Sequence, residues 1–101
     1  MYSTRIIHLF FLELGYSALQ QRQEKDAILY FLQAYNLSPN PEVALQLAYL
    51  YAGEKKEKTA VSFFLIASSS SNQHIAQLAA KAYLVVQQAI NTPSNSFVKN
   101  A

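Results

Sequence analysis

An internal repeat constrains the fold of this chain more than any other feature. When residues 9–34 are placed above residues 42–67, small residues align with small residues and aromatic residues with aromatic residues. The aligned pairs are Gly15 with Ala48, Tyr16 with Tyr49, Ala27 with Ala60, Phe31 with Phe64 and Ala34 with Ala67. A repeat of this length is typical of architectures in which one supersecondary unit stacks on the next. We therefore expect two copies of one structural unit to lie side by side.

Each copy is expected to form two helices. In the first copy, apolar residues recur at helical spacing over residues 6–19, and the polar segment 20–23 ends the pattern. A second helix is predicted over about residues 24–37. It ends before Pro39 and Pro41, because proline has no backbone N–H to donate and disfavours helix at the preceding residue.

The second copy is expected to begin a helix at Pro41, since proline is tolerated in a first helical turn. This helix is predicted to run to Ala52, with Gly53 supplying the left-handed residue that closes it. The following helix carries Phe64 and is expected to end at the serine run 68–71.

A fifth helix is predicted over about residues 73–91, because its apolar residues recur at helical spacing. Residues 93–101 are expected to form a disordered tail. Glycine occurs only twice and proline three times, too rarely for a β-protein with many turns. The pattern therefore predicts an all-α chain.

Several residues of the two copies match the positions that define a known helical repeat. They are Phe11, Leu14, Gly15, Ala27, Phe31, Ala34 and Pro39 in the first copy, and Leu47, Ala48, Tyr51, Ala60, Phe64 and Ala67 in the second. With these residues the unit resembles the tetratricopeptide repeat, a helix–turn–helix of about 34 residues. Ala18 and Ala44 depart from the family, which favours bulkier residues at both positions.

The resemblance implies tandem helix–turn–helix repeats that form a short right-handed superhelix with a C-terminal capping helix. The expected domain spans residues 1–92, with one repeat at about 4–38, a second at 41–71, and a half repeat or cap helix at 73–92. The resemblance also implies a non-catalytic module that binds a protein or peptide in the concave groove of the array, where the first helix of each repeat lines the surface.

The groove residues that the resemblance implies come from the first helix of each unit. They are Leu9, Leu12, Tyr16 and Leu19 in the first copy and Glu42, Leu45 and Tyr49 in the second. Tyr83 of the last helix joins them if that helix is aligned so that Tyr83 corresponds to Tyr49. The sequence leaves this alignment open. Tyrosine offers a broad ring and a hydroxyl at low conformational cost, so it is favoured at protein contacts. The alternative is that these rings only cover the edge of the core. A clamp for a C-terminal carboxylate is not expected, because Leu12 and Tyr16 supply no positive charge.

The first helix is apolar on nearly every side, which is typical of a helix buried all round. A terminal repeat needs a polar outer face. Two interpretations follow: the chain continues into neighbouring repeats of a longer array, or it self-associates through Ile6, Ile7 and Phe10.

Composition excludes several classes of function. Charged residues make up only 14 % of the chain and hydrophobic residues 51 %, against roughly 25 % charged in ordinary globular proteins, so the main body of the chain is not expected to be disordered. A net charge of +2 does not predict nucleic-acid binding. Segment 6–12 resembles the apolar core of a signal peptide, yet it is too short to span a bilayer and has no cleavage site, so no membrane insertion is expected.

No catalytic, metal-binding or cofactor-binding pattern is found. The chain has no cysteine, and His8 and His74 have no second ligand at a metal-binding spacing. The serine run lacks a nearby histidine base. An enzyme is the alternative from another class, and no catalytic constellation favours it.

Residues 40–51 are similar to repeat arrays in bacterial envelope proteins, such as the large subunits that precede an outer-membrane barrel in exopolysaccharide export or phage adsorption. This similarity implies an alternative function as a periplasmic spacer or scaffold segment. The compartment stays open between the cytoplasm and the bacterial periplasm or envelope.

Overall fold

The computed structural model describes residues 3–91, and these residues form five helices and no strand. The prediction of an all-α chain is therefore confirmed for this part of the sequence. The predicted tail 93–101 lies outside the described residues, as do residues 1, 2 and 92 of the predicted domain. The helices are α1 (Thr4–Gln20), α2 (Glu24–Leu37), α3 (Pro41–Gly53), α4 (Glu57–Ala67) and α5 (Gln73–Asn91).

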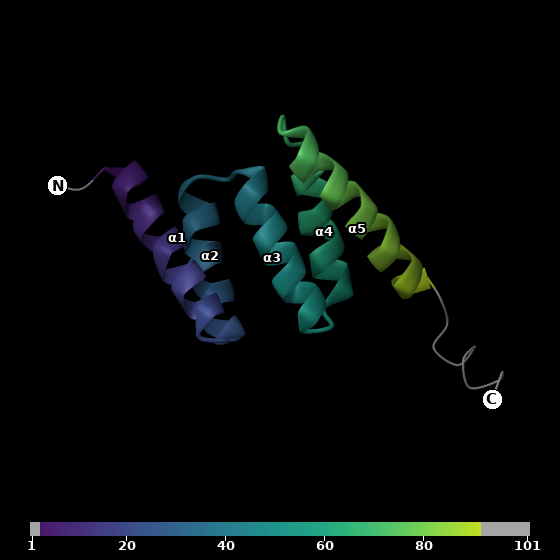
Figure 1. Ribbon diagram of the computed structural model, residues 1–101, viewed down its shortest axis with the longest axis horizontal. Helices are drawn as coiled ribbons and strands as arrows, with labels where there is room; N and C mark the ends of the chain where they lie inside the picture. The colour runs from purple at the N-terminus through teal and green to yellow at the C-terminus, as the bar shows by residue number, and fades with distance from the viewer. Residues whose placement is uncertain (1–2, 92–101) are drawn as a thin grey trace.

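The helices lie beside one another in the order of the chain, with α1 at one end of the row and α5 at the other (Figure 1). Each helix packs against the next one, and α3 also contacts α5. The closest pairs are α1 with α2 and α3 with α4, which are joined by short turns. The two copies of the sequence repeat are thus two helical hairpins.

The two hairpins close with the same hydrogen bonds. The amide of Gln23 donates to the carbonyl of Ala18 at 2.8 Å, and the amide of Lys56 donates to the carbonyl of Tyr51 at 2.9 Å. Each is the long bond of a Schellman motif, which satisfies carbonyls that the last turn of a helix leaves free. Gln23 aligns with Lys56 and Ala18 with Tyr51 in the same register as the paired core residues, so the repeat extends to the backbone of the turns.

The left-handed residue of each turn is not a glycine. Arg22 has φ of 60° and Lys55 has φ of 61°, and the two residues occupy equivalent positions in the two copies. Gly53 ends α3 and has no positive φ, so the prediction that it closes the helix in the left-handed conformation is wrong. The Schellman motif requires that conformation at the residue before Lys56, which is Lys55.

Polar caps fix where three of the helices begin. The Ser3 hydroxyl accepts from the amide of Ile6 at 3.2 Å, so α1 starts at Thr4, slightly before the apolar pattern. The Asn40 side-chain oxygen accepts from the amide of Val43 at 2.9 Å, and that of Asn72 accepts from the amide of Ile75 at 3.3 Å. Such caps satisfy amides that have no partner within the helix.

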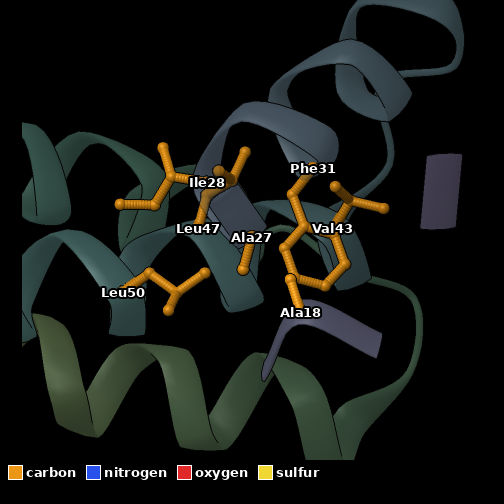
Figure 2. Close-up of a cluster of buried hydrophobic side chains, with 7 residues drawn as sticks. All are labelled: Ala18, Ala27, Ile28, Phe31, Val43, Leu47 and Leu50. Atoms are coloured by element: carbon orange, nitrogen blue, oxygen red, sulfur yellow. The ribbon is translucent and has the colours of Figure 1, made fainter. Parts of the chain in front are cut away.

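Two hydrophobic clusters form the core. One lies between α1, α2 and α3, and the other between α3, α4 and α5. The first contains Ala18, Ala27, Ile28, Phe31, Val43, Leu47 and Leu50, which converge from α1, α2 and α3 in Figure 2. The second contains Ala44, Leu45, Ala48, Ala60, Phe64, Ala67 and Ala79. Phe31 and Phe64 are almost fully buried, and each occupies the same place in its hairpin. Burying a side chain of this size contributes about 1.5–3 kcal/mol, so the clusters supply much of the stability.

An aromatic group joins the two hairpins. The ring of Phe63 stacks on Tyr51 with centroids 5.8 Å apart and meets Tyr35 edge-on at 5.6 Å. These three residues belong to α4, α3 and α2, so the contact fixes the second hairpin against the first. Aromatic pairs of this geometry contribute about 0.5–1.5 kcal/mol beyond their buried area.

Candidate polypeptide-binding face

Two tyrosines in matched positions are held against buried phenylalanines. The ring of Tyr16 meets Phe31 edge-on with centroids 5.1 Å apart, and the ring of Tyr49 meets Phe64 in the same way at 5.2 Å. Each tyrosine is 46 % exposed. One edge of each ring is therefore fixed by the core, and the remaining surface is open to solvent.

An electrostatic interaction links Tyr16 to the second hairpin. The pKa of the Tyr16 hydroxyl is raised from its usual value, first by partial burial and second by the negative charge of Glu42. Glu42 is exposed on the first turn of α3, so a charge from one hairpin acts on a tyrosine of the other. Tyr16 of α1 and Glu42 of α3 are thus close enough to influence one another.

The other residues expected in a groove fall into two environments. Leu9 is 51 % exposed and lies in the open. Leu12 and Leu19 are partly buried against the first cluster. Leu45 is a buried member of the second cluster, together with Ala79 of α5, so it is part of the core and cannot contact a ligand freely.

Tyr83 does not share the environment of Tyr16 and Tyr49. It is partly buried against the second cluster, as Tyr51 is. When the two asparagine caps, Asn40 and Asn72, are aligned, Tyr83 corresponds to Tyr51. The alignment of Tyr83 with Tyr49 is therefore replaced by the alignment of Asn72 with Asn40, which we call the register of the caps.

In the register of the caps, the counterpart of Tyr49 on α5 is Lys81, which is exposed. Sequence reasoning missed this residue because it aligned the last helix by its tyrosine and not by its cap. We call the exposed residues Leu9, Tyr16, Glu42, Tyr49 and Lys81 the tyrosine face. A shallow hollow lined by Glu24, Tyr49, Leu50, Gly53 and Glu54 lies at one side of it.

The residues expected to support self-association lie on α1, the first helix of the row (Figure 1). Ile6 is 54 % and Phe10 60 % exposed, whereas Ile7 is half-buried. Phe10 contacts Phe11 edge-on with centroids 6.0 Å apart. A patch of large apolar side chains is therefore open on this helix.

His8 has a packing role. It is buried, and its Nδ1 lies 2.8 Å from the carbonyl oxygen of Ala34, to which the protonated nitrogen donates. This bond ties α1 to the last turn of α2. His74 is exposed on α5.

Within residues 3–91, no group of three or more histidine or acidic side chains is placed to hold a metal ion. In the same part of the chain, every helix is too short or too polar to cross a membrane. Comparisons of the chain with models of known protein families, with curated proteins and with solved structures find no match.

Proposed function

We propose that this chain is a non-catalytic interaction module of the tetratricopeptide type, and that it binds an extended polypeptide along the tyrosine face. The observation that carries the proposal is the matched pair of half-exposed tyrosines, Tyr16 and Tyr49, each fixed edge-on against a buried phenylalanine. The matched Schellman turns and the matched asparagine caps support two and a half tandem repeats. Repeats of this kind stack into a right-handed superhelix whose first helices line one face.

The chemistry of the face fits a polypeptide ligand. A tyrosine ring that the core already holds loses little conformational entropy on binding, so more of its contact energy appears as affinity. The two hydroxyls donate and accept hydrogen bonds, which suits the backbone of an extended chain. Glu42 and Lys81 add one charge of each sign, so a ligand with complementary charges is favoured.

Peptide selection on the intact chain tests the proposal. A random library of short peptides displayed on phage is selected on the immobilised chain, and the affinity of the enriched peptides is measured by fluorescence anisotropy. The double variant Tyr16→Ala/Tyr49→Ala is expected to bind these peptides about ten-fold more weakly or worse, since truncated aromatic anchors dominate losses at such interfaces.

The matched control removes exposed apolar side chains elsewhere. Leu29 on α2 and Leu65 on α4 are exposed, so Leu29→Ala/Leu65→Ala is expected to keep the affinity. Equal binding by both folded double variants would eliminate the tyrosine face as the site. That result would favour the passive spacer, whose function does not depend on peptide binding by Tyr16 and Tyr49.

A second candidate function is assembly of the chain with itself through α1. It is favoured by the exposure of Ile6, Leu9 and Phe10, because a terminal helix with large uncovered apolar residues gains free energy when a second copy covers them. The measurement that tests it is the mass of the chain in solution as a function of concentration.

A further inference from the structure

The last helix can be aligned with α3 by its contacts. Both helices begin with an asparagine cap, Asn40 or Asn72. Aligning the caps also aligns Leu47 with Ala79, and both of these residues are fully buried. This register identifies which face of α5 corresponds to each face of α3.

In α3, two small residues receive the neighbouring helix. Ala44 and Ala48 are fully buried in the second cluster, in which α4 contributes Phe64. The first hairpin repeats the second of these positions, since Gly15 of α1 lies against the ring of Phe31 of α2, whereas the counterpart of Ala44 is Phe11. Small residues in these places allow the second helix of each hairpin to approach closely.

In α5 the same face carries two small residues, of which the first is half-buried and the second is exposed. The counterparts of Ala44 and Ala48 are Ala76 and Ala80. Ala80 is exposed, and Leu84, one turn further along the helix, is 62 % exposed. We call Ala76, Ala80 and Leu84 the α5 pairing face.

The turn that leads from α1 into α2 and from α3 into α4 has no equivalent in α5, where the chain continues as helix. The left-handed residues Arg22 and Lys55 lie in the turns between the two helices of each hairpin, and their counterpart on α5 is Gln87. The helix continues through Gln87 to Asn91. Within residues 3–91, no turn therefore brings a following helix over Ala80 as α4 is brought over Ala48.

We propose that the α5 pairing face binds an amphipathic α-helix of a partner polypeptide. The helix that fits carries a small residue, a phenylalanine four positions later and a second small residue three positions after that. The chain itself contains this pattern twice, as Ala27, Phe31 and Ala34 in α2 and as Ala60, Phe64 and Ala67 in α4, and both helices cover the face equivalent to that of Ala80. The phenylalanine fills the space above the small residue, and the rest of the helix removes Leu84 from water.

A synthetic peptide serves as the probe. A fluorescently labelled peptide with the sequence of residues 54–71 is titrated with the intact chain, together with the same peptide carrying Phe64→Ala. The unsubstituted peptide is expected to bind, and the Phe64→Ala peptide to bind about ten-fold more weakly, because its anchor is removed.

Variants of the chain locate the binding. Ala80→Arg and Ala80→Glu each place a long charged side chain on the pairing face, and both are expected to weaken peptide binding about ten-fold or more. Losses with both signs of charge exclude a simple electrostatic effect. Ala89→Arg changes an exposed alanine on the opposite side of α5 and is expected to leave the affinity unchanged.

Two further measurements keep the test decisive. Thermal unfolding followed by circular dichroism should be the same for Ala80→Arg and the unsubstituted chain, since Ala80 is exposed. The chain has no cysteine, so a dye on Leu84→Cys reports only on this face, and its emission should change when the peptide is added. The variant Tyr16→Ala/Tyr49→Ala should retain this binding, which separates the pairing face from the tyrosine face.

Three outcomes would overturn the proposal. The first is the absence of peptide binding by the unsubstituted chain. The second is binding that survives both Ala80 variants, because the peptide would then be replacing α4 on α3. The third is that the unsubstituted chain forms a dimer, that Ala80→Arg dissociates this dimer, and that no peptide binds. A second copy of the chain would then cover the face.

Discussion

Gly15 lies so close to Phe31 that a methyl group added at Gly15 would be 2.7 Å from Cε1 of the phenylalanine ring. Phe31 is completely buried, so its ring could move only by displacing the side chains around it. The second hairpin has Ala48 and Phe64 in the same two places and accommodates the methyl group there. The two hairpins therefore share one arrangement but differ in the local packing at this contact.

The contact predicts that Gly15→Ala destabilises the chain. Overpacking a core costs about 1–3 kcal/mol, while replacing a helical glycine by alanine returns about 0.5–1 kcal/mol. We expect a net decrease of about 1 kcal/mol in the free energy of unfolding, measured by urea denaturation with circular dichroism. An increase in stability would show that the helices separate at this contact without cost.

Gly53→Ala should have the opposite effect. Gly53 is the last residue of α3, has no positive φ, and an added methyl group there would meet no atom within 4 Å. The substitution lowers the entropy of the unfolded chain without creating a clash, so we expect a gain of about 0.5–1 kcal/mol in the free energy of unfolding. The same urea titration measures it, and a loss of stability would contradict the helical assignment of this residue.

The two left-handed turns predict a stabilisation by glycine. Arg22 and Lys55 hold positive φ, which costs an L-residue roughly 1–2 kcal/mol and glycine little. Lys55→Gly and Arg22→Gly should each raise the free energy of unfolding by only about 0.5–1 kcal/mol, because glycine also has more entropy to lose. Glu54, with φ of −89°, is the matched control, and Glu54→Gly should bring no gain. Equal effects at Glu54 and Lys55 would rule out backbone strain as the cause.

The ends of the helices could be predicted where the sequence contains a local signal. Pro39 lies between α2 and α3, Pro41 begins α3, and the polar segment 20–23 marks the end of α1 and the turn into α2. The left-handed residues could not be predicted from residue type. A Schellman turn places the left-handed conformation at a fixed position after the helix, and here arginine and lysine occupy that position. Glycine is the residue type expected at the left-handed position, but Gly53 lies two residues before that position, which Lys55 occupies.

The candidate face was only partly predictable, because periodicity assigns residues to a side of a helix without showing what lies opposite. Leu45 and Leu12 have the same type and the same place in the repeat, yet only Leu45 is buried, in the cluster that α5 helps to form. Tyr83 was assigned by its aromatic character, whereas the cap at Asn72 sets the register of its helix. The burial of Leu45 depends on contacts with α5 that no local pattern encodes, whereas the register of Tyr83 follows from a local cap.

The interaction between Tyr16 and Glu42 predicts a pH dependence. The pKa of Tyr16 is raised above 10.0, so its contribution to stability is fully present below pH 10.0 and is lost as the pH rises through the raised value. Glu42→Gln should lower this pKa towards its usual value, because it removes the neighbouring negative charge. The loss of stability at alkaline pH should then be smaller.

Nuclear magnetic resonance of the tyrosine Cζ carbons measures this pKa directly. The chain has seven tyrosines, so the spectrum of Tyr16→Phe is needed to assign the Tyr16 signal. Glu24→Gln, which removes an acidic group that does not act on Tyr16, is the control and should leave the Tyr16 titration unchanged. A Tyr16 pKa that is the same with and without Glu42 would show that burial alone raises it, and that the two hairpins are not electrostatically linked here.

The exposed residues of α1 predict that the chain associates with itself. Covering Ile6, Leu9 and Phe10 removes large apolar surfaces from water, and burial contributes roughly 25 cal/mol for each Å². A charge at the centre of such a contact is costly to desolvate, so Phe10→Glu should give a monomer at concentrations where the unsubstituted chain has a higher mass by light scattering. Leu29→Glu changes an equally exposed leucine on α2 and should not alter the mass. If the unsubstituted chain is monomeric at high concentration, α1 is not a self-association surface, and its apolar side is left for the preceding helix of a longer array or for a different protein.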